Sequence, residues 1–168
     1  MKTSAPVIVA LCSILHASAA DTPSNHKLSD WKIGPVLFGD APTESAMRGE
    51  LDFQGSFRRR VAMLKGLPVS ALQQVIDTVP LMDGAERLIT TLKKLGYKTA
   101  ILSGGFTFMG RELQRRLGID YLHANELDIA DGIVTGEVKT EIVDGARKAH
   151  YLAEIARAEG LTMDQVIA

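Results

Sequence analysis

The chain has 168 residues, of which 46% are hydrophobic and 23% charged, and its formal net charge at pH 7 is −1. This composition is typical of a globular domain with a sizeable core and excludes an intrinsically disordered protein, while the near-balanced charge argues against a nucleic-acid partner. A single cysteine excludes an internal disulfide and a multi-cysteine zinc site, and no apolar run reaches the roughly 18 residues that span a bilayer.

The first 19 residues have the layout of a secretory signal peptide. A lysine at position 2 precedes the mostly apolar stretch Ala5–Leu15, and Ala17-Ser18-Ala19 fits a small-x-small cleavage pattern. Residues 1–19 are therefore interpreted as a signal peptide or as a start that is not native to the fold. Pro6–Leu11 is also rich in β-prone residues, so a buried strand at this place is the competing interpretation.

The predicted helices follow a segment in which apolar residues show no sustained periodicity. Residues 20–42 are polar and rich in Pro, Ser and Gly, which indicates a linker. Apolar residues at spacings of three and four then predict helices over Phe53–Leu64, Ser70–Val79 and Asp83–Leu95. Ser70 is the expected cap of the second of these helices.

The segment after the third predicted helix combines a strand, a short loop and another helix. Lys98–Leu102 is an apolar strand, Ser103-Gly104-Gly105 interrupts it, and Phe106–Leu117 again has helical spacing. A hydroxyl and bare backbone N–H groups at the carboxyl end of a buried strand suit a phosphate, and open α/β sheets bind ligands at such ends. From these residues alone, an ordinary strand-to-helix turn is the alternative.

The rest of the chain predicts a hairpin, a helix and a last strand. Leu127–Ile129 and Ile133–Thr135 alternate in polarity around an Asp-Gly turn, which favours a β-hairpin. Ala146–Glu159 is a predicted helix with Asp144 as its N-cap, and Met163–Ala168 begins like a buried strand. This order of elements predicts an α/β fold with a parallel sheet flanked by helices.

Four separated segments resemble the phosphoserine phosphatases of the haloacid dehalogenase superfamily. They occur in the family's order and are Ala46–Phe53, Ser56–Arg60, Leu102–Phe106 and Ala124–Leu127. The resemblance covers about residues 43–168 and implies a Rossmann-like HAD core with a small helical cap inserted after the first strand. It implies that residues 43–80 form the cap region and residues 81–168 part of the core, with the fold incomplete at both ends.

The resemblance also implies an activity. These enzymes are magnesium-dependent phosphomonoesterases that hydrolyse O-phosphoserine to serine and phosphate in L-serine biosynthesis. The implied partner is this small-molecule substrate, without nucleic acid or a membrane span. The implied location is the cytoplasm, with export as the alternative if residues 1–19 act as a signal peptide. The sequence gives no indication of an oligomeric state.

The resemblance implies roles for six residues of this chain. Ser103 and Lys148 are the implied catalytic residues: the serine binds the phosphoryl group, Gly104 beside it offers a backbone N–H, and the lysine neutralises charge. The implied substrate contacts in the cap region are Met47, Phe53 and Arg60. A planar guanidinium suits bidentate pairing with the substrate carboxylate, which is the implied role of Arg60.

Two motifs of the family have no match. No Asp-x-Asp-x-Thr occurs before residue 43, although the aspartate nucleophile is expected near Leu15, and the chain ends at Ala168 before the Gly-Asp-Gly motif. The magnesium ligands are therefore missing from this chain, no metal-ligating residue is assigned, and we expect no phosphatase activity from it. The alternatives are a non-catalytic remnant that binds phosphate or a phosphoamino acid, and a truncated or misjoined product without function.

The missing first strand also bears on the fold. In this family that strand lies in the middle of the sheet and pairs on both sides, so without it Lys98–Leu102 would expose an unpaired edge. Pro6–Leu11 is the segment of this chain that could take its place. A strand there and a cleaved signal peptide are mutually exclusive expectations.

Overall fold

The computed structural model describes residues Ile8–Leu11 and 53–168, and the chain divides into two compact units. The sheet unit consists of Met1–His16, Leu81–Asn125 and Val143–Ala168, and the hairpin unit consists of Ala17–Pro80 and Glu126–Ile142. Three sequence expectations lie outside the described residues: the cleavage pattern Ala17-Ser18-Ala19, the linker over residues 20–42, and the substrate contact Met47.

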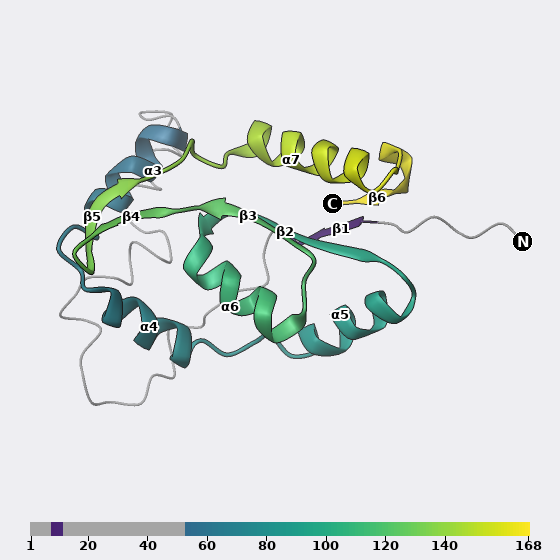
Figure 1. Ribbon diagram of the computed structural model, residues 1–168, viewed down its shortest axis with the longest axis horizontal. Coiled ribbons are helices and arrows are strands. Elements are labelled where there is room, and N and C mark those ends of the chain that lie inside the picture. The colour runs from purple at the N-terminus through teal and green to yellow at the C-terminus, as the bar shows by residue number, and fades with distance from the viewer. Residues whose placement is uncertain (1–7, 12–52) are drawn as a thin grey trace, which may run out of the picture. The chain divides into compact units, whose positions relative to one another are not determined.

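The sheet unit is built on a parallel four-stranded sheet with the order β3-β2-β1-β6 (Figure 1). Its strands are β1 (Ile8–Leu11), β2 (Lys98–Phe106), β3 (Tyr121–Asn125) and β6 (Val166–Ile167). The backbone of Ile8 is in register with Lys98 on one side and Val166 on the other. The strand expected as the competing interpretation of Pro6–Leu11 therefore exists over Ile8–Leu11, and it gives β2 a partner on the side away from β3.

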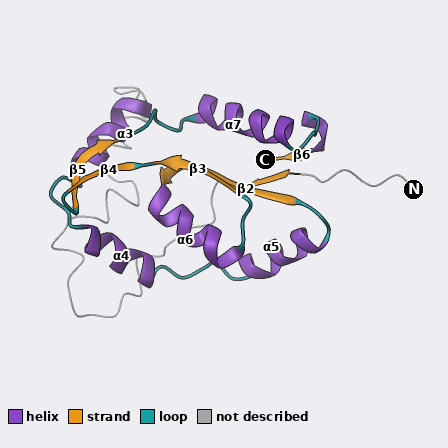
Figure 2. Ribbon diagram, in the orientation of Figure 1, coloured by secondary structure: helices purple, strands orange, loops and turns teal. Residues whose placement is uncertain are grey.

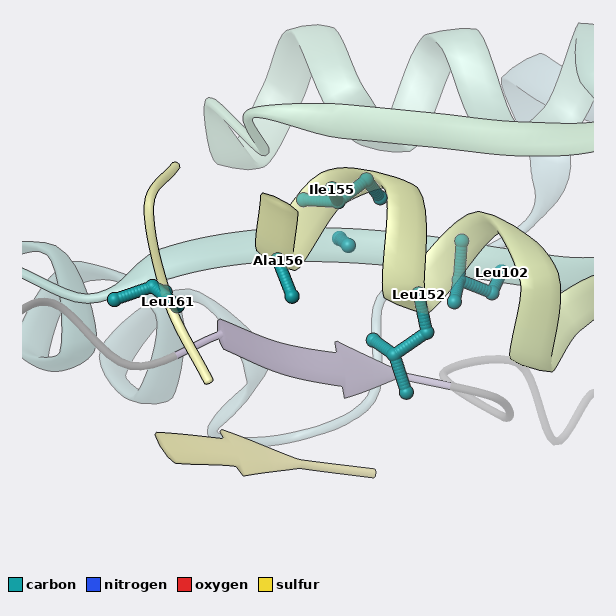
Figure 3. Close-up of a cluster of buried hydrophobic side chains, with 6 residues drawn as sticks. Leu102, Leu152, Ile155, Ala156 and Leu161 are labelled. Atoms are coloured by element: carbon teal, nitrogen blue, oxygen red, sulfur yellow. The ribbon is translucent and has the colours of Figure 1, made fainter. Parts of the chain in front are cut away.

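Helices cover both faces of this sheet (Figure 2). Alternate residues of a strand point to opposite faces, so β2 contributes to two separate cores. On one face, α7 (Gly145–Ala158) packs on β2 in a buried cluster, most of which Figure 3 labels: Ala100, Leu102, Leu152, Ile155, Ala156 and Leu161. On the other face, α5 (Ala85–Lys94) and α6 (Thr107–Leu117) bury a second cluster: Ile89, Ile101, Leu113, Leu117 and Ile119.

The ends of these elements match the predicted signals in part. Asp144 caps α7 as expected, because its Oδ1 accepts from the N–H of Arg147 at 2.9 Å. The predicted strand Lys98–Leu102 is too short, because β2 runs on to Phe106. The last segment forms a short 3-10 turn over Met163–Gln165 before the two residues of β6. No helix within residues 53–168 is both long and apolar enough to cross a bilayer.

The hairpin unit contains two helices and a two-stranded antiparallel sheet. These are α3 (Phe53–Ala62), α4 (Val69–Thr78), β4 (Leu127–Ala130) and β5 (Ile133–Val138). The predicted Asp-Gly turn is present, with positive φ at both of its residues. The expected Ser70 cap is wrong: α4 begins at Val69, and its N-cap position is occupied by a proline whose fixed φ suits a helix start.

Backbone hydrogen bonds join the α3–α4 connection to the hairpin. The N–H of Gly66 donates to the carbonyl of Val134 at 2.9 Å, and the N–H of Val134 donates to the carbonyl of Leu67 at 2.8 Å. Both Val134 and Leu67 are buried. The residues between the two helices are therefore tied to β5 almost as an additional strand.

Gly136 of β5 lies close to the end of α3 and the residues that follow it. It has a φ of +90°, and a Cβ built on it would lie 3.0 Å from Lys65 Cβ and 3.4 Å from Ala62 Cα. We expect Gly136→Ala to lower the free energy of unfolding by about 1–3 kcal/mol, because it combines left-handed backbone strain with a steric clash. Circular dichroism during urea unfolding measures this.

Gly132→Ala is the matched control for this prediction. Gly132 has a φ of +76°, but no atom lies within 4 Å of its built Cβ. The control therefore carries the backbone strain without the clash. An equal loss of stability in the two variants would show that the close approach of α3 contributes nothing.

Candidate anion-binding site

The predicted phosphate loop is a bulge in β2. Leu102 is in register with His123 of β3, and Phe106 is in register with Asn125. Three residues of β2, Ser103–Gly105, therefore stand opposite the single residue Ala124. The excess residues cannot continue the regular ladder, so this part of the backbone is available for contacts other than strand pairing.

Ser103 and Gly105 form a local hydrogen bond within this loop. The N–H of Gly105 donates to Ser103 Oγ at 3.0 Å. Ser103 and Gly104 are half-buried and Gly105 is exposed. A hydroxyl that accepts from a backbone N–H keeps its own proton, which remains available to donate to an anion. A Cβ on Gly105 would lie 3.2 Å from Ser103 Oγ, so a side chain there would disturb the hydroxyl.

The side chain of Asn125 supports the same loop from within the sheet unit. Its Nδ2 donates to the carbonyl of Gly104 at 2.9 Å and to the carbonyl of Gly105 at 3.2 Å. Its Oδ1 accepts from the N–H of Val143 at 2.8 Å. Asn125 is fully buried, at 0% exposure. It is the residue of this region to which the sequence analysis gave no role, because a polar residue at a strand end does not reveal its partners.

Lys148 lies one turn into α7. The carbonyl of Asp144 accepts from the N–H of Lys148 at 3.0 Å, so the lysine belongs to the first helical turn after the cap. Lys148 is half-buried. Leu152, four residues later, packs in the same buried cluster as Leu102. Because residues four apart share a helix face, Lys148 lies on the face of α7 that carries Leu152.

Phe53 and Arg60 both belong to α3 in the hairpin unit. Phe53 is 46% exposed, and its ring stacks on that of Phe57 with centroids 6.3 Å apart. The guanidinium carbon of Arg60 lies 5.8 Å from the Phe57 centroid. Among the described residues, the buried Nε of Arg60 has no hydrogen-bond partner. Burial lowers the pKa of Arg60 by desolvation, yet an arginine stays charged in proteins.

The structure therefore groups the expected site residues by unit. Ser103 and Gly104 share one loop, and Lys148 belongs to the same unit as that loop. Phe53 and Arg60 belong to the other unit and lie on one helix. Met47 lies outside the described residues. The functional roles of all six residues remain predictions.

The residues described here do not supply a magnesium site. Within Ile8–Leu11 and residues 53–168, no three His, Cys, Asp or Glu residues come together as a group that could hold a metal ion. Magnesium prefers oxygen ligands, mainly carboxylates, so the donor set around Ser103 does not fit this ion. The site as described offers a hydroxyl and backbone amides, which suit an anion.

The curated proteins that are similar to this chain include phosphoserine phosphatases from several organisms. A curated phosphoserine phosphatase of Archaeoglobus fulgidus is 44% identical over 126 residues, which cover 75% of this chain and 37% of that protein. One of Haemophilus influenzae is 49% identical over 128 residues, covering 76% of this chain and 41% of that protein. The chain thus spans well under two thirds of the length of these curated relatives.

A solved structure and a family model extend the similarity to more of the chain. A substrate-bound phosphoserine phosphatase complex superposes with a TM-score of 0.79 at 28% identity, covering 98% of this chain and 77% of that one. The model of the haloacid dehalogenase-like hydrolases matches residues 28–168. The α/β architecture with a parallel sheet between helices agrees with both findings. The protein therefore belongs to the haloacid dehalogenase-like hydrolase family.

Proposed function

We propose that this chain binds the phosphoryl group of a phosphoserine phosphatase-type substrate, O-phosphoserine, in the loop Ser103–Gly105. The observation that carries the proposal is the bulge that removes this loop from the strand ladder at the carboxyl end of β2. The curated relatives with 44% and 49% identity are phosphoserine phosphatases, which supports this choice of substrate.

The chemistry of a phosphate monoester suits the proposed ligands. Its charge is spread over equatorial oxygens, which hydroxyl, amide and ammonium donors stabilise. Ser103 donates its hydroxyl proton and Gly104 its backbone N–H to these oxygens. Lys148 supplies the positive charge, and its place one turn before Leu152 on α7 supports this role, because Leu152 shares a buried cluster with Leu102, the residue before Ser103.

Arg60 is proposed to pair with the carboxylate of the substrate. Its Nε is buried without a hydrogen-bond partner among residues 53–168, and a partner for such a group is strongly favoured. A guanidinium presents paired donors that match a carboxylate. Phe53 and Met47 complete the proposed substrate contacts of this part of the chain.

We further propose that the 168 residues bind this substrate without turning it over. The enzymes that the chain resembles use an aspartate nucleophile, which splits the hydrolysis into two easier steps through an aspartyl phosphate. The residues that follow β1 in the sequence are Cys12-Ser13-Ile14-Leu15-His16, which include no carboxylate. The family uses magnesium, but the described residues do not fit this ion.

Binding is tested first by titrating the chain with O-phosphoserine in a calorimeter. We expect saturable binding that Ser103→Ala weakens about 10- to 100-fold, because a hydrogen bond to a charged group contributes roughly 1.5–3 kcal/mol. Thr107→Val, which removes a hydroxyl at the start of α6, is the control and should leave the affinity unchanged. Equal affinities of the parent and Ser103→Ala would refute the proposed loop.

Turnover is tested separately by measuring phosphate release from O-phosphoserine in the presence of magnesium. We expect release at the uncatalysed rate. Phosphate release at an enzyme-like rate would contradict the proposed lack of turnover while leaving the binding proposal intact. A cooperative thermal transition of the same sample establishes that the chain is folded during both measurements.

A further inference from the structure

We propose that Asn125 is the positioning residue of the anion-binding loop, fixing the Ser103 hydroxyl and the start of α7 with one side-chain amide. This inference rests on the function proposed above and concerns how the same site is assembled. Asn125 does not touch the substrate in this proposal. It acts through the backbone of Gly104, Gly105 and Val143.

The three hydrogen bonds that the Asn125 side chain makes all join it to backbone groups. Its Nδ2 donates to the carbonyls of Gly104 and Gly105, at 2.9 and 3.2 Å, and its Oδ1 accepts from the N–H of Val143 at 2.8 Å. These partners also determine the orientation of the amide, since exchanging its nitrogen and oxygen would oppose like groups. A fully buried amide satisfied in this way holds its neighbours in one arrangement.

The contact with Gly104 orients the hydroxyl of Ser103. In a planar trans peptide, the carbonyl of one residue and the N–H of the next point in opposite directions. When Asn125 holds the Gly104 carbonyl, it therefore turns the N–H of Gly105 away from itself. That N–H donates to Ser103 Oγ at 3.0 Å, so the serine oxygen is fixed as an acceptor and its proton is left to face a ligand.

The contact with Val143 fixes the start of α7. Val143 directly precedes Asp144, the N-cap whose Oδ1 accepts from the N–H of Arg147 at 2.9 Å. The carbonyl of Asp144 accepts from the N–H of Lys148 at 3.0 Å. A single side chain thus links the loop that carries the hydroxyl to the helical turn that carries the ammonium group.

The role requires an amide. Two carbonyls need a donor and one N–H needs an acceptor, and a carboxylate of the same shape has acceptors only. Asn125→Asp is therefore the sharpest variant. It keeps the side-chain volume and the acceptor for the N–H of Val143, but it places a carboxylate oxygen, which cannot donate, against the carbonyls of Gly104 and Gly105. Protonation of the introduced carboxyl at low pH returns one donor, so part of the loss should be recovered there.

The experiment compares inorganic phosphate binding by the parent, Asn125→Asp and Asn125→Ala, measured by calorimetry on the full chain. We expect both variants to bind phosphate about 10-fold more weakly, and the deficit of Asn125→Asp relative to the parent to shrink as the pH falls. The control is Thr99→Val. Thr99 is also fully buried in β2 and hydrogen-bonded, but its side-chain partner is Asp120. This variant should lose stability without losing affinity.

A second measurement works without phosphate binding. In proton–nitrogen correlation spectra of the free protein, the Gly105 amide signal should move, and its hydrogen exchange should accelerate, in both Asn125 variants and not in Thr99→Val. In the parent protein, the side-chain amide protons of Asn125 should exchange slowly with solvent. This measurement uses the parent alone, so it holds even if the variants fail to fold.

The outcomes separate this inference from the proposed function. Folded Asn125 variants that bind phosphate as the parent does would overturn the positioning role, and so would an unchanged Gly105 amide or rapidly exchanging Asn125 side-chain protons. A parent that fails to bind phosphate, with Gly105 responding to Asn125 as expected, would refute the proposed function and leave the positioning role standing. Loss of affinity in Thr99→Val as well would reduce Asn125 to a general stabilising residue.

Discussion

Leu102→Ala is expected to lower the free energy of unfolding by about 2–5 kcal/mol. Leu102 is 1% exposed and is the last buried residue of β2 before the bulge. Its side chain packs in the cluster that joins β2 to α7, together with Leu152 and Ile155 (Figure 3). Removing three carbon atoms there loses burial and leaves a cavity that the surrounding helix and strand cannot fully close.

The measurement is urea unfolding followed by circular dichroism, with Leu95→Ala as the matched control. Leu95 follows α5 and is 67% exposed, so the same chemical change there should alter stability little. A loss in Leu102→Ala no larger than that in Leu95→Ala would mean that the contact between β2 and α7 does not stabilise the sheet unit.

Lys148→Met is expected to weaken the binding of inorganic phosphate about 10- to 100-fold, which corresponds to the free energy of one charge-assisted hydrogen bond. Methionine keeps much of the apolar stem of the half-buried lysine and removes only its charged end. The remaining affinity should also depend less on salt, because one charge of the site is lost.

Lys94→Met is the charge-matched control for this prediction. Lys94 is an exposed lysine in the last turn of α5, in the same unit as the loop. Calorimetric titrations of both variants at two ionic strengths distinguish a local ligand from a general effect of net charge. Equal affinities of the two variants would show that Lys148 contributes no more than any surface lysine of this unit.

Local signals in the sequence predicted most elements of the fold. The helices at Phe53, Asp83 and Ala146 and the Asp-Gly hairpin were predicted from periodicity and turn chemistry, both of which act over a few residues. The strand Tyr121–Asn125 was not predicted, since its five residues lack a clear alternation of apolar and polar side chains. The Ser70 cap failed because Pro68 already occupies the N-cap position two residues earlier.

Contacts between distant segments were harder to predict. The resemblance implied that residues 81–168, which include the hairpin, form part of the core. In the structure, Glu126–Ile142 instead groups with residues 53–80, because the α3–α4 connection hydrogen-bonds to Val134. Such pairing depends on register between segments far apart in sequence, which composition and periodicity do not encode.

The candidate site shows the same division. Ser103 and Gly104 were singled out from the residues themselves, because a hydroxyl and glycines after a buried strand are a local pattern. The roles of Lys148 and Arg60 came only from the resemblance, since a lone lysine or arginine on a helix usually faces water. Asn125 was given no role, because its significance lies in two carbonyls and one N–H that only the folded chain brings together.

The position of β1 within the sheet has a consequence for how the protein acquires its structure. Long stretches of chain separate Ile8 from its partners Lys98 and Val166. The strand can therefore pair only when segments that lie far apart in the sequence come together. Sheets whose strands pair over long sequence separations fold slowly, and their folding intermediates expose hydrophobic surface that favours aggregation. The yield of native protein should therefore depend on chaperones and on the rate of synthesis more strongly than its final stability suggests.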